Sequence, residues 1–295
     1  MARNIFKRLY IRISGLFLKL KYGLHSNKAR PIARSRFVQC SHQGVLFMIE
    51  CNSQVELLRA KTFESKEPVT LRWIDTCLHS GEVLFDIGAN IGLYSLYAAL
   101  RYKNEIPVFA FEPEALNFAK LNRNIFINKL SKKVISYPIA IHNKLDFDFL
   151  YLNESKLIED QRGVQYVPGT ALHNYREPVD QFKSQFKPLH VHGAFGVSLD
   201  MLCYEFNFPI PNHLKIDVDG NELKILEGSK KLLQDVRLKT ICIEFPSVKN
   251  DQERMSDLLR KNNFKLDPLF YEPFRQTDFQ LQNSVFTRSP LLDTL

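Results

Sequence analysis

The 295-residue sequence has few cysteines, and none of them are paired in a motif. The five are Cys40, Cys51, Cys77, Cys203 and Cys242, and no two form a CxxC pair. Their odd number and scattered positions argue against both a disulfide framework and a zinc site. We therefore expect a protein of the reducing cytoplasm that needs no metal ion, with the alternative that the pair Asp217 and Asp219 holds Mg²⁺.

The N-terminal segment lacks an apolar run long enough to span a membrane. Within residues 1–24 the apolar side chains are interrupted by Arg12, Lys19 and Lys21, so there is neither a span of ~20 residues nor a clean signal-peptide core. On a helix, however, the large apolar residues share one face and basic residues flank it. This pattern predicts an amphipathic helix on the cytoplasmic face of an anionic membrane. The alternative is a basic helix packed on the protein's own body or on a partner.

Acidic residues are absent from the same end of the chain. Residues 1–36 carry ten of the 40 Lys and Arg and no Asp or Glu, which leaves 30 basic and 32 acidic residues in the rest. A protein that binds nucleic acid usually spreads positive charge over its binding face. The formal net charge of +8 is instead confined to one end, so we expect no nucleic-acid partner.

Apolar strands alternate with helices through most of the chain, which is typical of a parallel sheet covered on both faces. We expect strands at 83–86, 108–111, 134–142, 214–218 and 240–245, and helices at 91–101, 114–128, 222–233 and 252–262. Two last strands, at 265–271 and 284–288, predict an antiparallel edge hairpin. The fold class is therefore α/β, with a doubly wound, mostly parallel sheet over residues 81–295. Residues 37–80 predict a β-hairpin and a helix, and 1–36 form the basic extension.

A glycine-rich loop, Asp86-Ile87-Gly88-Ala89-Asn90-Ile91-Gly92, follows the first of these strands. Gly88 and Gly92 let the turn tighten, and the loop must lie at the carboxyl edge of the sheet, where α/β sheets bind ligands. Glu112 ends the next strand, the usual place for an acid that binds ribose hydroxyls. The loop lacks the G-x-G-x-x-G spacing of nicotinamide dinucleotide sites. Asp86 instead suits a ligand with a positive amino or sulfonium group, such as S-adenosylmethionine.

Candidate catalytic groups follow the later strands. Asp217 and Asp219, two residues apart after the fourth strand, point the same way on an extended chain and could steer or deprotonate a hydroxyl. Glu244 ends the fifth strand and borders the same edge, and His142 ends the third. His173, His190 and His192 lie in an irregular insert at 143–196, for which we expect a role in binding the acceptor.

Taken together, DIGANIG at 86–92, FEP at 111–113, LKIDVDGNE at 214–222 and ILEG at 225–228 resemble the FkbM-type methyltransferase family in order and spacing. The resemblance covers roughly residues 80–246. It implies the class I, Rossmann-like methyltransferase fold, S-adenosylmethionine as cofactor, and O-methylation of sugar or polyketide hydroxyls. By this resemblance the cofactor-binding positions are Asp86, Gly88, Asn90, Gly92 and Glu112, with Ala140 near the adenine. The family more often has Glu at the position of Asp219.

We therefore expect an S-adenosylmethionine-dependent methyltransferase that acts on a sugar hydroxyl of a glycan, glycolipid or secondary metabolite. Asp217, His142 and Glu244 are the candidate bases. Two alternatives stay open, since a fold does not fix a function. One is methylation of a nitrogen or a lipid head group, and the other is an inactive cofactor-binding subunit of a membrane-associated assembly. The sequence does not indicate an oligomeric state.

Overall fold

The computed structural model describes residues 36–103, 105–153, 159–160, 163–164, 166–170, 173–245, 248–270 and 283–289. The amphipathic helix expected at 1–24, and all of the basic extension except Arg36, lie outside these residues.

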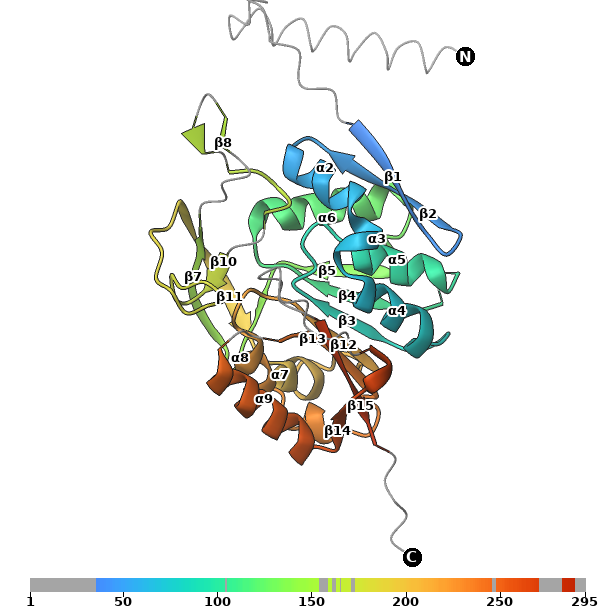
Figure 1. Cartoon of the computed structure of the whole chain (residues 1–295), viewed down its shortest axis with the longest axis vertical. Helices are drawn as coiled ribbons and strands as arrows, with labels where there is room; N and C mark the ends of the chain where they lie inside the picture. Colours follow the sequence, from blue (N-terminus) through green and yellow to red (C-terminus); the bar gives the residue numbers. More distant parts are fainter. Residues whose placement is uncertain are drawn as a thin grey trace, which may run out of the picture. The chain divides into compact units, whose positions relative to one another are not determined.

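A seven-stranded sheet forms the centre of the molecule (Figure 1). Its strands lie in the order β14 (Phe264–Leu266), β15 (Asn283–Arg288), β13 (Thr240–Glu244), β12 (His213–Ile216), β3 (Leu84–Ile87), β4 (Val108–Phe111) and β5 (Val134–Tyr137). The five from β13 to β5 are parallel, and β15 is antiparallel to both β13 and β14. The mostly parallel sheet and its antiparallel edge hairpin are thus confirmed.

Helices cover both faces of this sheet, as expected. On one face α4 (Pro68–Cys77), α5 (Leu93–Arg101) and α6 (Ala115–Ile127) share a buried apolar core. On the other face α7 (Leu199–Tyr204), α8 (Glu222–Glu227) and α9 (Lys249–Lys261) share a second core. Neighbouring strand residues alternate between the two cores, as Leu84 and Phe85 do, which is the period of two that a sheet covered on both faces requires.

The segment before the sheet packs on the first of these cores. The hairpin of β1 (Arg36–His42) and β2 (Val45–Cys51) has the predicted turn. Two short helices follow that were not predicted, α2 (Gln54–Lys61) and α3 (Phe63–Lys66). Ser53 and Glu56 form a capping box at the start of α2, a local signal that was present in the sequence.

Three predicted elements are wrong in extent. The strand expected at 265–271 is only β14, which ends at Leu266 and is followed by the 3₁₀ helix η3 (Pro268–Phe270). The strand expected at 134–142 is two strands, because Pro138 cannot donate a ladder hydrogen bond; β5 ends at Tyr137, and β6 (Ala140–Ile141) belongs to another sheet. The helix expected at 222–233 ends at Glu227 and is followed by the short 3₁₀ helix η2 (Leu232–Gln234).

The insert is more regular than expected. Together with β6, the strands β7 (Asp146–Leu152), β10 (His173–Tyr175) and β11 (His190–Val197) form a four-stranded sheet in the order β10-β7-β11-β6. A separate pair, β8 (Glu159–Asp160) and β9 (Gly163–Val164), lies between β7 and β10 in the chain. Ala140, Leu150, Leu152 and Tyr175 form a small core of this sheet, which lies beside the main sheet (Figure 1). The strands β9, β10 and β11 therefore correct the prediction of an irregular insert.

Candidate functional site

The glycine loop joins β3 to α5 at the carboxyl edge of the main sheet. Gly88 has a φ of +78°, and a methyl group on it would lie 1.8 Å from the carbonyl oxygen of Asp217. Gly92 has a φ of +93°, and its methyl group would lie 2.5 Å from the side chain of Leu121 on α6. Gly88 is therefore required by the backbone that packs against it, and Gly92 is favoured by its left-handed backbone conformation, since the Leu121 side chain can move.

Glu112 lies where β4 ends, fully buried at 0% exposure. One of its carboxylate oxygens accepts the backbone N–H of Asn90 at 2.8 Å, and the other accepts that of Glu114 at 2.9 Å. Burial raises the pKa of this carboxyl, and the nearby His173 partly offsets the effect. Glu112 thus ties the glycine loop to the start of α6.

A narrow slot of ≈ 30 Å³ runs beside the glycine loop. Apolar side chains make up most of its wall, and it is lined by Ile87, Gly88, Phe111, Pro113, Ile139, Ala140, Ile141, Leu150, His173, Tyr175, Val218 and Asn221. Ala140 pairs with Gly196 of β11, so the insert sheet forms one wall. The wall of this slot, between the ends of β3, β4 and β12, has the apolar character that suits a flat aromatic base, although its present volume is too small for one.

A buried ammonium lies between two carboxylates at the ends of β3 and β12. Lys215 faces Asp86 in the strand register, and its Nζ lies 3.0 Å from Asp217 Oδ2, 3.7 Å from Asp86 Oδ1 and 5.3 Å from the centre of the Tyr94 ring. Ser95 donates a hydrogen bond of 2.5 Å to the other oxygen of Asp86. Lys215 was not singled out from the sequence, although its place two residues before Asp217 on a strand puts both side chains on one face.

The charges of this cluster are set by burial and by one another. Burial lowers the pKa of Lys215, but Asp217 and Asp86 more than compensate and raise it, so the ammonium stays charged. Burial raises the pKa of Asp217, but Lys215 outweighs it and holds that pKa below its ordinary value. Asp86, which is 1% exposed, keeps a raised pKa because burial dominates.

Two further carboxylates belong to the cluster. The pKa of Glu244 on β13 is raised well above its ordinary value by burial and by the nearby Asp217. Glu67, which precedes α4, binds the hydroxyl of Tyr94 and accepts a hydrogen bond from Asn283 on β15 at 3.1 Å. Sequence reasoning missed Glu67, because it lies before the glycine loop in the chain and only the fold brings it to this edge.

Asp219 and Glu222 shape the turn after β12. Asp219 has a φ of +55°, and its carbonyl oxygen accepts a hydrogen bond of 3.4 Å from Asn174 of the insert. Glu222 is 2% exposed and accepts the backbone N–H of Gly220 at 3.1 Å. Burial raises the pKa of Glu222 to about 7. The backbone of Asp219 and the side chain of Glu222 therefore both take part in the conformation of this turn.

The histidines weighed as bases are dispersed. His142 is 5% exposed, packs edge-on against Tyr175 and is not among the residues that line the slot; burial lowers its pKa to about 4. His173 lies over Glu112, with its Nε2 3.7 Å from the carboxylate. His190 and His192 lie on β11, with their rings 6.0 Å apart. The structure thus brings Asp217 and Glu244 together and places these histidines elsewhere.

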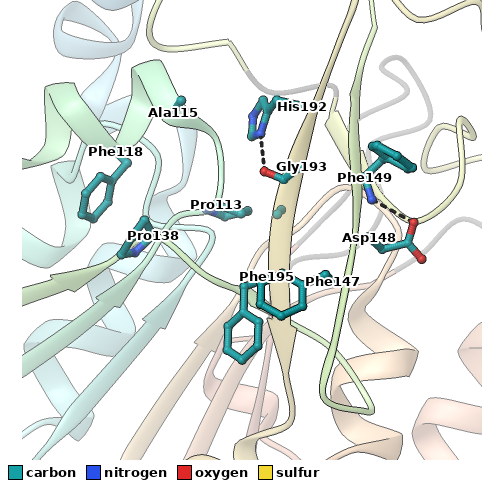
Figure 2. Close-up of a pocket in the computed structure, with 11 residues that line it drawn as sticks. Pro113, Ala115, Phe118, Pro138, Phe147, Asp148, Phe149, His192, Gly193 and Phe195 are labelled. Atoms are coloured by element: carbon teal, nitrogen blue, oxygen red, sulfur yellow. Dashed lines mark hydrogen bonds between the residues drawn. The ribbon is translucent and has the colours of Figure 1, made fainter.

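A second cavity, a groove of ≈ 530 Å³, lies between the start of α6 and the insert sheet (Figure 2). Aromatic and other apolar residues dominate its wall, and it is lined by Pro113, Ala115, Phe118, Pro138, Phe147, Asp148, Phe149, His192, Gly193, Ala194 and Phe195. Phe147 is 85% exposed and Phe149 is 53% exposed, and the ring of Phe195 lies 5.0 Å from that of Phe147. Pro113 lines both the groove and the slot.

Within the described parts of the chain, no group of three or more His, Cys, Asp or Glu side chains is arranged to hold a metal ion. In those same parts, no helix is both long and apolar enough to cross a membrane.

Comparison with known proteins gives sequence relatives that are methyltransferases. A family model described as the methyltransferase FkbM domain matches residues 86–266. The 31-O-demethyl-FK506 methyltransferase FkbM of Streptomyces tacrolimicus is 24% identical over 226 residues, which cover 65% of this chain and 78% of that protein. The hexuronic acid methyltransferase AglP of Haloferax volcanii is 23% identical over 216 residues, which cover 73% of this chain and 77% of that protein.

Among solved structures, TYW2 of M. jannaschii in complex with AdoMet aligns with a TM-score of 0.40 and 15% identity, over 87% of this chain and 88% of that one. The precorrin-6y C5,15-methyltransferase of Geobacter metallireducens GS-15 aligns with a TM-score of 0.40 and 13% identity, over 69% of this chain and 75% of that one.

Proposed function

Because the chain belongs to the FkbM methyltransferase family and is an S-adenosylmethionine-dependent methyltransferase, we propose that its acceptor is the hydroxyl group of a sugar. The observation that carries the proposal is an ionised carboxylate, Asp217, held by a buried lysine beside the glycine loop. A hydroxyl must lose its proton as it is methylated, and a carboxylate at the reacting end of the site can take that proton.

The residues of the slot and its surroundings fit the cofactor. The apolar slot beside Gly88 suits the adenine, and both oxygens of Glu112 keep capacity to accept ribose hydroxyls. Asp86 Oδ1 is buried without a hydrogen-bond partner, which fits the positive end of the methionine moiety. When bound there, S-adenosylmethionine supplies a methyl group already activated by its sulfonium charge.

The protein's own part is to position the acceptor and to receive its proton. Asp217 Oδ2 contacts the Lys215 ammonium, which leaves Oδ1 to accept the proton of the acceptor hydroxyl. The side chain of Asp217 is one quarter exposed, so an acceptor can reach it. Burial and the nearby Asp217 raise the pKa of Glu244, which favours the protonated form of that carboxyl, and in that form it can donate a hydrogen bond to the acceptor. Holding the hydroxyl in line supplies most of the acceleration.

The groove of Figure 2 supports a sugar as the acceptor, and it fits the role expected for the insert. It combines exposed aromatic rings, Phe147 and Phe149, with a carboxylate, Asp148, and an imidazole, His192. Sugars present both apolar C–H faces and hydroxyl groups, so this mixture of surfaces suits them. The hexuronic acid methyltransferase relative, by its name, acts on a sugar acid.

Transfer of labelled methyl groups tests the proposal. The protein is incubated with methyl-labelled S-adenosylmethionine and neutral sugars, uronic acids, glycolipids, amines or phospholipid head groups. We expect label in a sugar product that resists alkali, as an ether does and a methyl ester does not. Asp217→Asn should bind cofactor but lose about 10²-fold in turnover. Label on nitrogen, on a carboxylate or on a lipid head group, or binding of cofactor without any transfer, would contradict it.

A further inference from the structure

The acid expected to bind ribose is covered by the insert. Glu112 has no exposed surface, and each of its oxygens accepts one backbone N–H. A carboxylate can accept about four hydrogen bonds, so both oxygens have room for one more donor. The side chain that faces them is His173, at the start of β10.

His173 and Glu112 face each other but do not form a hydrogen bond with each other. The distance from His173 Nε2 to Glu112 Oε1 is 3.7 Å, longer than a hydrogen bond. The other ring nitrogen, Nδ1, is buried without a hydrogen-bond partner, and the side chain is 12% exposed. Buried polar groups in folded proteins are nearly always paired. Because Nε2, and not the unpartnered Nδ1, faces the carboxylate, it is the gap between Nε2 and Glu112 Oε1 that points to a third group bridging them.

The place of His173 identifies that group. His173 lines the slot together with Gly88 and Ala140, two positions for which the resemblance to the family implies cofactor binding. A ribose hydroxyl can donate a hydrogen bond to Glu112 and accept one from the imidazole N–H. We propose that His173 is a cofactor-binding residue that, together with Glu112, holds the ribose hydroxyls of S-adenosylmethionine.

The roof that carries His173 is attached on both sides of the slot. We define the roof as residues 166–170 and 173–183. On one side the carbonyl oxygen of Thr170 accepts hydrogen bonds of 2.9 Å from both Asn90 and Asn117. On the other side the side chain of Asn174 accepts a hydrogen bond of 2.9 Å from Asn221. Lys183 donates a hydrogen bond of 2.9 Å to the backbone carbonyl of Gly220.

This roof has to move before a nucleoside can enter. The slot measures ≈ 30 Å³, whereas ligand pockets usually measure ~300–1,000 Å³. The contact of His173 with ribose therefore forms as the roof closes over the ligand. His173 acts on the nucleoside end, whereas proton transfer belongs to the cluster around Asp217.

Calorimetric binding of S-adenosylhomocysteine and of its 2′,3′-dideoxyribose analogue tests this role. We expect His173→Ala to weaken binding of S-adenosylhomocysteine about tenfold, the loss of one hydrogen bond to a charged network. Binding of the dideoxy analogue should change less than twofold, because it lacks the hydroxyls. His173→Gln, which keeps a donor, should recover part of the affinity.

His79→Ala is the matched control, since His79 is an exposed residue in the turn before β3. It should bind both ligands as the unchanged protein does. Equal binding of S-adenosylhomocysteine by His173→Ala and the unchanged protein would overturn the proposal. So would an equal loss for both ligands, because that result would give His173 a structural role in the roof. The measurement needs no acceptor, so it is independent of the sugar proposal.

Discussion

At the scale of single residues, the charge balance around Lys215 links the stability of the fold to the site. One ammonium, 3% exposed, lies between Asp86 and Asp217. Breaking a buried ion pair by removing one partner is strongly destabilising, because the remaining charge has no counter-charge. The pair therefore supports the fold as well as the orientation of Asp217.

We predict that Lys215→Met lowers the free energy of unfolding by about 3–5 kcal/mol, as measured by urea denaturation. The double variant Lys215→Met/Asp86→Asn should be more stable than Lys215→Met alone, because it removes the carboxylate left unpaired. A double variant whose loss equals the sum of the two single losses would show that the two side chains are not coupled.

His142 should make stability depend on pH. Burial lowers its pKa from 6.5 to about 4, so between these values the unfolded chain binds the proton and the folded protein does not. His142 therefore does not reduce the free energy of unfolding above pH 6.5. As the pH drops from 6.5 towards 4, it lowers that free energy by about 1.4 kcal/mol per pH unit at most.

The measurement compares urea unfolding of the unchanged protein and of His142→Gln at pH 5 and pH 7.5. Glu222, whose pKa is raised to about 7, contributes in the opposite direction and is common to both proteins. We expect the variant to lose less stability between the two pH values. The same loss in both would assign the pH dependence to other groups.

At the scale of elements, the sequence predicted the main sheet and the glycine loop well, since the apolar strands and Gly88–Gly92 carry strong local signals. It did not predict β10, which is only three residues long, or β11, which contains two histidines and two glycines; both become strands by pairing with β7. Lys215 was missed for a related reason. A lysine on a strand is usually exposed, and its burial follows from carboxylates that only the fold places beside it.

The attachment of the roof to α6 can be weakened by a substitution at one residue, Asn117. Asn117 accepts a hydrogen bond of 2.7 Å from the backbone N–H of Gly169 and donates one to the carbonyl of Thr170. We predict that Asn117→Ala increases hydrogen–deuterium exchange in a peptide covering 166–170 about tenfold, since each such bond contributes about 1 kcal/mol. Asn122→Ala, at an exposed asparagine on the same helix, should leave exchange there unchanged. Equal exchange in both variants would show that Asn117 does not hold the roof.

At the scale of the whole molecule, the segregation of charge predicts attachment to membranes. The ten cations of residues 1–36 precede a body that is nearly neutral. Each Lys or Arg near an anionic surface contributes about 1 kcal/mol. We predict that the full chain co-sediments with anionic liposomes at low salt and much less at high salt, and that a 25–295 variant does not.

Neutral liposomes serve as the control for lipid charge, and thermal unfolding of the 25–295 variant checks its fold. Equal sedimentation of the two proteins would remove the membrane proposal. A truncated form that fails to fold would instead support a helix packed on the body. Binding at the membrane would bring the protein close to lipid-linked glycans, a source of sugar hydroxyls.

The attachment of the roof on both sides of the slot also limits the rate at which the cofactor can be exchanged. The roof must open in each catalytic cycle so that S-adenosylhomocysteine can leave and S-adenosylmethionine can enter. Such motions take microseconds to milliseconds or longer. When a cover of this kind moves more slowly than the bond-forming step, the first methyl group is delivered before the first cofactor leaves. Mixing enzyme with excess substrates would then give a rapid burst of product, equal in amount to the enzyme, followed by a slower steady rate. Loosening the cover at Asn117 would speed the slow phase and leave the burst untouched.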